Sequence, residues 1–286
     1  MIIDGKAIAL DIRDILLAEI RTRKELDIPM LYIIVAGGNA ATKSFVALKK
    51  KYAAGLGIPV RERVFAAQSV TTETLLGAIQ EVVASGMRGG IVVQLPLPPS
   101  VDTKAVLDAI PLRYDVDVLS EKAVRFFEEG ESPVLPPVIG AFREILERHS
   151  VFLRGKRVAI LGKGRLVGAP AAAWFRRRGA DVHVVDSKTP DVAAETRMAD
   201  VIVSGIGRPW FITPDIVKDG AILLDAGTSS LDELGTGKAG GKVVGDAHPD
   251  TAEKCALFTP VPGGIGPLTV AVLFQNLLTL TKDTTV

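Results

Sequence analysis

The sequence has one cysteine, no excess of either charge and no long apolar run, and each absence excludes a class of protein. A single cysteine, Cys255, rules out an intrachain disulfide framework and a multi-cysteine zinc site. We expect this thiol to be buried or half-buried, and we expect no bound metal. Because 34 basic residues balance 33 acidic ones, giving a formal net charge of +1, a nucleic-acid or membrane-surface partner is disfavoured.

A membrane span and a leader peptide are not expected either. Spanning a bilayer takes about 20 apolar residues, and runs such as Met30–Gly37 are far shorter. The opening stretch, MIIDGKAIALDIRDIL, places acids and bases where a signal peptide would need an uninterrupted apolar core. These features predict a soluble, cytoplasmic protein.

The chain does contain enough apolar sequence for a large core. Hydrophobic residues make up 48% of its 286 positions, which excludes global disorder, and this length favours two domains. Strand-length apolar runs alternate with segments of helical period, a pattern that indicates parallel sheets in an α/β fold. A glycine- and proline-rich segment places the domain boundary near residues 130–150. The predicted strands cover residues 30–35, 60–65, 90–95, 157–161, 181–185, 200–204 and 221–225, and the predicted helices cover 41–56, 71–85, 138–148, 166–178, 213–218 and 267–282.

A glycine-rich turn follows the first strand of the second series. In RVAILGKGRLVGAP (157–170) the strand ends at Leu161, and Gly162, Gly164 and Gly168 occupy the turn and the start of a helix. Such glycines let backbone N–H groups and a helix N-terminus approach a pyrophosphate. The spacing is one residue longer than the usual fingerprint, and a tight turn without a ligand is the alternative.

Asp186 ends the second strand of this series, about twenty residues after the turn. An acid there hydrogen-bonds the adenosine ribose and disfavours a 2′-phosphate, which favours NAD. A simpler alternative is that Asp186 caps the next helix. Nearby polar and basic residues would instead receive the 2′-phosphate of NADP: Lys163, Arg165, Ser187, Lys188 and Thr189.

In the first half, the helical segment 40–58 carries Phe45 and Lys49 four residues apart, on one face. An aromatic ring beside an amine suits a site that stacks a flat heterocycle and moves protons. The alternative is that Lys49, Lys50 and Lys51 are solvated charges, and the helix by itself favours that interpretation.

Two further polar features follow apolar segments. Gln94 interrupts the strand GGIVVQL near its carboxyl end, where open α/β sheets bind ligands, although a glutamine at an exposed strand exit would look the same. Asp115 and Asp117 lie two apart, on opposite faces if the segment is extended. One acid would accept a bond from a ligand while the other caps a turn, or both are solvated.

The stretch FTPVPGGIGPLTVAVLFQNLL (258–278) holds three prolines and three glycines before an apolar helix. Proline fixes φ and glycine permits close backbone approach, so this loop is expected to be rigid and to press against a flat ligand.

These pieces occur in one order that resembles the methylenetetrahydrofolate dehydrogenase/cyclohydrolase family. The resemblance covers nearly the whole chain, and VQLPLP and TPVPGGIGP carry it most specifically. The matching segments are IIDGKAIA (2–9), the 41–58 helix, VQLPLP (93–98), DVDV (115–118), LGKGRLVGAP (161–170), ADVIVSGIGRP (199–209), KDGAILLDAG (218–227), GDA (245–247) and TPVPGGIGPLT (259–269).

The resemblance implies a fold, two activities and a set of site residues. It implies an N-terminal α/β catalytic domain (1–145), completed by the C-terminal helix (267–286) packing back on it, and a Rossmann-type NAD(P)-binding domain (146–266). It further implies oxidation of methylenetetrahydrofolate, hydrolysis of the methenyl product to 10-formyltetrahydrofolate, NADP (with NAD possible) as cofactor and a homodimer formed through the nucleotide-binding domains. The implied catalytic residues are Lys49, Gln94 and Asp117; those at the folate are Phe45, Pro262, Gly263 and Gly264; those at the cofactor are Gly162, Lys163, Gly164, Arg165, Val167, Gly168, Asp186, Ser187, Thr189, Gly205 and Gly207.

Several positions depart from the family pattern. Phe45 stands where tyrosine is usual, which keeps the stacking face and loses a hydroxyl that Tyr52, one turn beyond Lys49, would have to replace. Lys163 and Gly164 replace arginine and serine, Asp186 replaces histidine, Val118 replaces glycine, and LPPV (135–138) replaces a proline–cysteine–threonine–proline stretch. Two alternatives therefore stay open: another two-domain nicotinamide dehydrogenase, of shikimate or amino-acid type, and a folate-binding paralogue without turnover.

Overall fold

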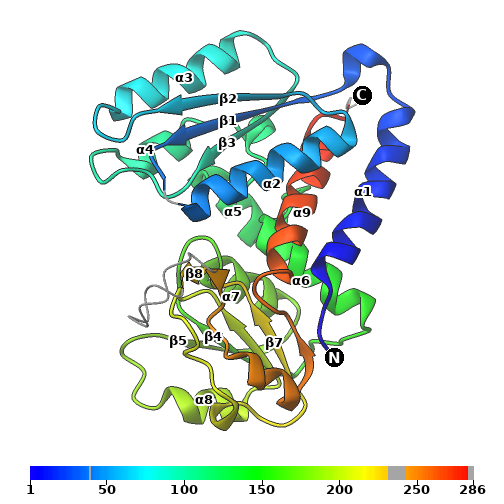
Figure 1. The fold of residues 1–286 in the computed structure, drawn as a ribbon, viewed down its shortest axis with the longest axis vertical. Coiled ribbons are helices and arrows are strands. Elements are labelled where there is room, and N and C mark those ends of the chain that lie inside the picture. The colour runs from blue at the N-terminus through cyan, green and yellow to red at the C-terminus, as the bar shows by residue number, and fades with distance from the viewer. Residues whose placement is uncertain (39, 231–242, 283–286) are drawn as a thin grey trace. The chain divides into compact units, whose positions relative to one another are not determined.

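A computed structural model describes residues 1–38, 40–230 and 243–282. The chain divides into two compact units, each assembled from separate stretches of sequence. Residues 9–137 and 270–286 form the first, here called the three-stranded unit after the sheet that its described residues build. Residues 1–8 and 138–269 form the second, the five-stranded unit, named in the same way (Figure 1).

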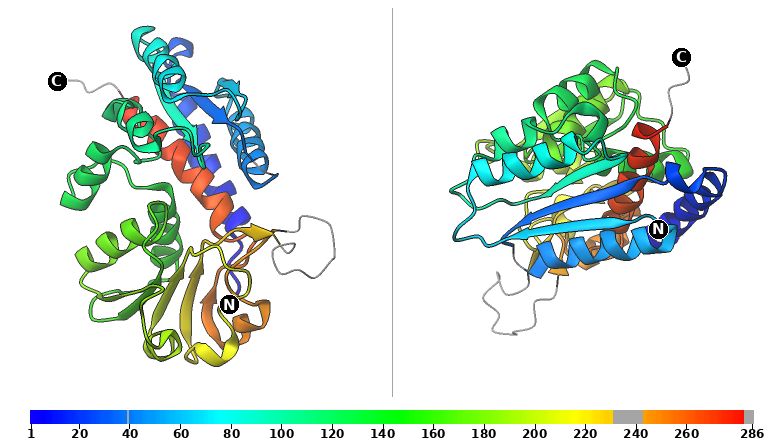
Figure 2. Two further views of the ribbon diagram at one scale, coloured as in Figure 1. Left: turned by 90° about the vertical axis from the view of Figure 1, so that its left-hand side faces the viewer. Right: turned by 90° about the horizontal axis from the view of Figure 1, so that it is seen from above.

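The three-stranded unit contains a parallel sheet in the order β2–β1–β3. The central strand, β1, is buried along almost its whole length because helices cover both faces of the sheet, as parallel sheets require. Helices α2 and α3 lie on opposite faces (Figures 1 and 2). The elements are α1 (Gly5–Arg21), η1 (Glu25–Asp27), β1 (Met30–Ala36), α2 (Ala40–Leu56), β2 (Val60–Phe65), α3 (Thr72–Ala84), β3 (Gly89–Gln94), α4 (Thr103–Asp108), η2 (Leu112–Tyr114), α5 (Glu121–Glu129) and α9 (Ile265–Leu280).

The five-stranded unit has the parallel strand order β10–β7–β6–β4–β5. Its first strand, β4, lies between β5 and β6, so the chain leaves β4 in both directions across the sheet. That switch point is where open α/β sheets bind ligands. The N-terminal segment pairs with the edge strand β10 of this sheet: Ile2 bridges to Phe258, and the N–H of Ile3 donates to the Phe258 carbonyl (2.8 Å). The elements are α6 (Pro137–Arg148), β4 (Arg157–Leu161), α7 (Gly168–Arg177), β5 (Asp181–Val185), α8 (Val192–Met198), β6 (Val201–Ser204), η3 (Pro214–Ile216), β7 (Ala221–Asp225), β8 (Ser229–Ser230), β9 (Val243–Val244), η5 (Pro249–Lys254) and β10 (Cys255–Phe258).

The predicted parallel α/β architecture is confirmed, and all seven predicted strands are present within a residue or so at each end. The helix predicted over 213–218 is wrong: Pro214 opens only the 3-10 turn η3, whose last residue is Ile216. The predicted C-terminal helix is α9, although residues 283–286 lie outside the described residues. In the described part of the chain, no helix is both long and apolar enough to cross a membrane.

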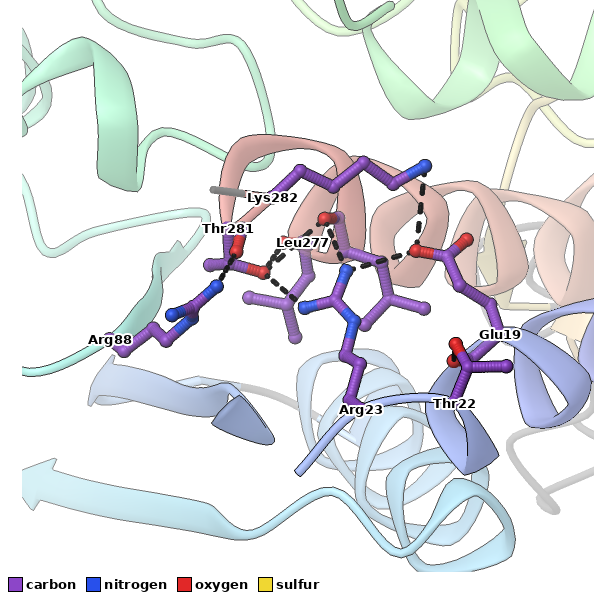
Figure 3. Close-up of polar contacts among 8 residues, drawn as sticks. Glu19, Thr22, Arg23, Arg88, Leu277, Thr281 and Lys282 are labelled. Carbon is purple, nitrogen blue, oxygen red and sulfur yellow. Dashed lines mark hydrogen bonds and ion pairs between the residues drawn. The ribbon is translucent and has the colours of Figure 1, made fainter. Parts of the chain in front are cut away.

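The carboxyl end of α9 is held by arginines from two distant segments (Figure 3). Arg23, just after α1, donates to the carbonyl of Leu278 (2.9 Å) and to the hydroxyl of Thr281 (3.3 Å). Arg88, just before β3, donates to the Thr281 carbonyl. The last carbonyls of a helix have no partner within it and carry partial negative charge, so cations are well placed there. These bonds fasten α9 to α1 and β3 within the three-stranded unit.

Candidate active site

Lys49 lies on α2 and points its amine at the carboxyl end of β3. Its Nζ donates to Oε1 of Gln94 (2.8 Å), and the Gln94 amide in turn donates to the Leu95 carbonyl (3.0 Å). Only 8% of Lys49 is exposed, and this burial lowers the pKa of its amine, partly offset by the charge of Asp117. A buried, hydrogen-bonded amine of lowered pKa is suited to proton transfer.

The neighbouring lysines behave differently. Lys50 is exposed and pairs with Glu62 on β2 (2.7 Å), and Lys51 is exposed. The interpretation of this helix as a row of solvated charges therefore holds for these two and is wrong for Lys49. Gln94 does end an edge strand, as the alternative interpretation holds, but its side chain is half-buried and bonded to Lys49 rather than exposed.

Asp117 is the third member of this cluster. It is half-buried in the loop that follows η2, and burial raises the pKa of its carboxyl while the charge of Lys49 lowers it. Lys49, Gln94 and Asp117 come from a helix, a strand and a loop, and the three-stranded unit brings them together.

The loop of Asp117 is shaped by other polar side chains. Asp115 is 1% exposed, and its carboxylate accepts from the N–H groups of Leu119 and Ser120 (2.8–3.1 Å). Asp115 therefore caps a turn, as one of the sequence interpretations holds, and the ligand-accepting role of Asp117 stays a prediction. The segment is not extended, because Val118 adopts a positive φ of 56°.

Sequence reasoning missed Asn276, which supports the same loop from α9. Its side-chain amide donates to the carbonyls of Val116 and Leu135 (both 2.8 Å), and the residue is 4% exposed. A buried asparagine in an otherwise apolar helix needs such partners. That interruption of the apolar run was the signal that would have found it.

Phe45 and Tyr52 flank Lys49 on α2 by about one turn each. Phe45 is half-buried. The Tyr52 hydroxyl donates to the Ala9 carbonyl (2.9 Å), and its ring stacks on Phe274 with centroids 5.3 Å apart. Tyr52 is committed to α1 and α9, so it does not replace the missing hydroxyl beside Lys49.

In the five-stranded unit, the turn after β4 is built on close backbone contacts. Gly162 has a φ of 86°, and its N–H donates to the Val185 carbonyl (2.7 Å). A Cβ on Gly168 would lie 2.1 Å from the Gly162 carbonyl oxygen, and one on Gly205 would lie 2.6 Å from the Val167 side chain. Helix α7 begins here with no side-chain cap at Val167, while Lys163, Gly164 and Arg165 are exposed. This glycine-lined cradle beside an uncapped helix N-terminus fits a pyrophosphate.

Asp186 lies beside that turn at the end of β5. Its carboxylate forms an ion pair with Lys163 (2.8 Å) and accepts from the Lys188 N–H (2.8 Å), and the Lys163 bond lowers the pKa of the carboxyl. The prediction that it caps the next helix is wrong, because Asp191 caps α8. Ser187 is exposed next to it, and the neighbouring hollow of about 360 Å³ is lined by His183, Val184, Val185, Asp186, Lys188, Thr189, Pro190 and Glu195.

Pro262, Gly263 and Gly264 belong to the loop between β10 and α9. Gly263 has a φ of 114°. A Cβ on Gly5 would lie 1.8 Å from the Gly264 carbonyl oxygen, so the loop packs backbone against backbone with the N-terminal segment. The remaining predicted glycine, Gly207, has a φ of 65° in the loop after β6.

A glycine-lined turn at the switch point of a parallel sheet is typical of dinucleotide-binding folds. With an acid–base cluster in its other unit, the protein has the features of a two-domain NAD(P)-binding enzyme. Two family models match: the catalytic domain of tetrahydrofolate dehydrogenase/cyclohydrolase over residues 3–117, and its NAD(P)-binding domain over residues 136–285. The chain belongs to the tetrahydrofolate dehydrogenase/cyclohydrolase family.

Individual relatives are similar along their whole length. A bifunctional protein FolD from Lactobacillus gasseri is 36% identical over 98% of this chain and 97% of its own. The crystal structure of the Campylobacter jejuni bifunctional FolD superposes with a TM-score of 0.90 at 31% identity, covering 99% of both chains. The Trypanosoma brucei enzyme, complexed with NADP and an inhibitor, gives 0.91 at 34% identity, covering 99% of this chain and 98% of its own.

The likeness to shikimate 5-dehydrogenase from Thermus thermophilus is one of fold alone. Its TM-score is 0.54 at 16% identity, covering 86% of this chain and 92% of that one. The shikimate-type alternative therefore has no support beyond the fold.

Proposed function

We propose that this chain oxidises 5,10-methylenetetrahydrofolate to the 5,10-methenyl form with NAD(P)+ and then hydrolyses that product to 10-formyltetrahydrofolate. The observation that carries the proposal is the buried Lys49–Gln94 hydrogen bond beside Asp117. Membership of the family and the activities of its similar relatives support it.

The three-stranded unit is assigned the folate chemistry. In the hydrolysis, water adds to the methenyl carbon, loses both of its protons and becomes the formyl oxygen as the carbon–nitrogen bond to N5 opens. One proton is released, which balances the charge of the methenyl cation, and the other is transferred to N5. Lys49 takes up and returns that proton, since its pKa is lowered by burial, and the Gln94 oxygen orients its amine. Asp117 accepts a hydrogen bond from the pterin, and Phe45 contacts its ring. The loop Pro262–Gly264, which belongs to the five-stranded unit, is also assigned to the folate.

The five-stranded unit is assigned the cofactor. Gly162, Gly168 and Gly205 leave room that a Cβ would fill, and the N-terminus of α7 faces the turn. When bound, NAD(P)+ supplies the hydride acceptor. The folate nitrogens stabilise the forming cation through their lone pairs, so the protein needs to orient the substrate rather than move a proton in this step.

We propose NADP as the preferred cofactor, with NAD as a possible substitute. Lys188 and Lys163, which pairs with Asp186, place positive charge beside Ser187 and Thr189, and Arg165 is a further exposed cation in the turn of Lys163; this favours a 2′-phosphate. Asp186 opposes this preference, but Lys163 is paired with it and offsets part of its charge.

Replacing the amine of Lys49 tests the proposal. Lys49→Met should lower methenyl hydrolysis by about a hundredfold or more, because the proton shuttle is lost. The fold should persist, since an apolar side chain replaces a buried amine. Hydrolysis is followed by the loss of methenyltetrahydrofolate absorbance, with circular dichroism to monitor folding.

Lys50→Met is the matched control, because Lys50 is the next residue on α2 and forms only an exposed ion pair. It should change hydrolysis less than about twofold. Undiminished hydrolysis in Lys49→Met would refute the assignment. A wild-type protein that binds folate tightly without turnover would instead indicate a non-catalytic paralogue.

We also propose a homodimer formed through the five-stranded unit, and a cytoplasmic location. Strand β5 ends the five-stranded sheet, and its Val182 and Val184 are only partly buried, so this edge suits pairing with a second copy. The free, buried thiol of Cys255 favours a reducing compartment. Light scattering on a sizing column measures the oligomeric state, and a monomer at micromolar concentration would contradict the dimer.

A further inference from the structure

Two buried carboxyls in the five-stranded unit have no part in the reaction described above. Asp225 ends β7 and is 1% exposed, and Asp246 follows β9 and is 0% exposed. Burying an acid is costly unless hydrogen bonds or charges compensate it. Two buried acids close to each other therefore indicate a specific role, and their hydrogen-bond partners show which segments of the chain they hold.

Asp246 holds the loop that follows β6. One carboxylate oxygen accepts from the Ser204 hydroxyl (2.6 Å) and the Ile206 N–H (2.9 Å). The other oxygen accepts from the Arg208 N–H (2.8 Å). Both oxygens therefore accept from the segment Ser204–Arg208, and any change that removes one acceptor leaves a donor of this loop unpaired.

Asp225 also holds backbone segments with both of its carboxylate oxygens. Its two oxygens accept from the N–H groups of Gly227 and Ala247 (both 2.8 Å). A Cβ on Gly227 would lie 2.2 Å from the Asp246 carboxyl carbon, and one on Gly245 would lie 2.2 Å from a carboxylate oxygen of Asp225. Asp246 therefore packs against Gly227, two residues after Asp225, and Asp225 packs against Gly245, the residue before Asp246. These reciprocal contacts hold the segments Asp225–Gly227 and Gly245–Ala247 together.

The loop that Asp246 holds packs against the dinucleotide turn. A Cβ on Gly205 would meet the Val167 side chain at 2.6 Å, and one on Gly162 would meet the Ile206 side chain at 2.9 Å. A shift of the Ser204–Arg208 loop must therefore move, or clash with, the turn between β4 and α7.

We propose that Asp246 is a positioning residue for the dinucleotide: its carboxylate fixes the loop Ser204–Arg208 against the phosphate turn, and Asp225 makes that fixation depend on a proton. The proposal rests on the proposed function in one respect only, that this turn receives NAD(P).

The proton dependence follows from the burial of the pair. Burial and the neighbouring charge of Asp246 raise the pKa of Asp225 to about 7. Among the residues that the structure describes, Asp246 is the charged side chain that raises this pKa; the Arg208 guanidinium stacks on Phe211, and the His248 ring lies against Trp210. An acid whose pKa is raised by folding stabilises the fold at low pH, and that contribution is lost as the pH rises toward 7. Above that pH two negative charges face each other, and the loop and its hold on the cofactor weaken.

Direct binding of NADPH, measured by its fluorescence without any folate present, tests the proposal. In Asp246→Asn an amide donor faces the donors of the loop, and the dissociation constant should rise about tenfold to a hundredfold. Ser204→Ala, which removes one donor and disturbs folding least, should raise it by a smaller factor. Asp215→Asn, an exposed acid of the same unit, should leave it unchanged.

A pH series tests the role of Asp225. Wild-type affinity for NADPH should fall between about pH 6 and pH 8, and Asp225→Asn should show a flatter profile. Gly227→Ala, whose methyl would displace the Asp246 carboxyl without changing any charge, should weaken binding at every pH.

Methenyl hydrolysis, measured on the same variants, distinguishes a loss of cofactor positioning from a general loss of folded protein. Methenyl hydrolysis depends on Lys49 and Gln94 in the other unit, so Asp246→Asn should raise the KM for the cofactor and leave hydrolysis unchanged. Unchanged NADPH affinity in Asp246→Asn and Ser204→Ala, or an equal loss of both activities, would overturn the proposal. A wild type that binds NADPH but turns over no folate would overturn the proposed function and leave this inference standing.

Discussion

Residue 45 is a phenylalanine one helical turn before Lys49, at a position where the family resemblance implies tyrosine. A hydroxyl there would share the proton movements of the hydrolysis, while hydride transfer needs only the ring face. Phe45→Tyr should therefore raise methenyl hydrolysis about tenfold and change NADPH formation little. The two rates are measured on one preparation at the methenyltetrahydrofolate and NADPH absorbances.

Tyr52→Phe is the control for this substitution. It removes a hydroxyl that is bonded to the Ala9 carbonyl, away from the Lys49 amine. The ratio of the two activities should stay at its wild-type value. An equal gain in both activities of Phe45→Tyr would contradict the assigned role of the missing hydroxyl.

Val118 is a β-branched residue in the left-handed region, with a φ of 56° next to Asp117. That conformation costs an L-residue about 1–2 kcal/mol and costs glycine little. Val118→Gly and Val118→Ala both lose the buried isopropyl group. The difference between their free energies of unfolding therefore reports the cost of the backbone conformation at this residue. The glycine variant should be more stable than the alanine variant by about 1 kcal/mol, measured by urea unfolding.

Val64 supplies the matched pair, because it is 66% exposed on β2 in extended backbone. There glycine should be less stable than alanine by about 0.5–1 kcal/mol. If alanine were the more stable residue at both positions, the loop of Asp117 would not be strained at Val118.

Asp186 forms an ion pair with Lys163 (2.8 Å), and in the proposed cofactor site the two charges would act oppositely on a 2′-phosphate. Asp186→Ser removes the acid and frees the amine for a 2′-phosphate, so the ratio of kcat/KM for NADP over NAD should rise about tenfold. Initial rates with each cofactor give this ratio. Lys163→Met should shift it the opposite way, and an unchanged ratio in Asp186→Ser would mean that the carboxylate only shapes its own turn.

At the scale of the elements, the end of α9 depends on cations that come from elsewhere in the chain. Arg23→Met removes two hydrogen bonds to α9 and the ion pair with Glu19 (2.9 Å). The free energy of unfolding should fall by about 2 kcal/mol, because a mostly buried charge-assisted cap is lost. Arg21→Met, two residues earlier and exposed, should stay within about 0.5 kcal/mol of wild type.

Most strands of the two sheets could be predicted because they are short apolar runs bounded by polar or glycine residues. Strand β2 instead alternates apolar and charged residues, and β10 of the five-stranded sheet was not predicted. Helices α1, α4, α5 and α8 were not predicted, although α4, α5 and α8 each begin after a side-chain N-cap: Asp102, Ser120 and Asp191. The helix predicted over 213–218 failed because a proline-initiated stretch of apolar and polar residues fits a single 3-10 turn equally well.

The site shows where local pattern stops being informative. Nothing in the run Lys49–Lys51 distinguishes the buried lysine, because its burial depends on Gln94 and Asp117, which lie 45 or more residues away. The family resemblance singled it out where periodicity did not. The partners of Asn276 and Asp246 depend on folded loops in the same way.

At the scale of the whole molecule, the chain passes between its two units three times, near residues 8, 137 and 269. The three-stranded unit therefore combines residues 9–137 with residues that follow position 269. Its core includes Phe274 and Leu277 of α9, both 0% exposed. Neither unit can be excised as one continuous fragment.

This interleaving sets an order for the protein as it leaves the ribosome. Strands β1–β3 emerge first, but the part of α9 that closes their core is translated only after the five-stranded unit. The five-stranded unit, although most of it is encoded later, has its whole sequence available before the earlier sheet does. A nascent chain halted before residue 270 would contain every residue of the five-stranded unit but would lack the part of α9 that completes the three-stranded unit. The unit whose strands are translated first is thus the unit that waits longer for the last segment of its core.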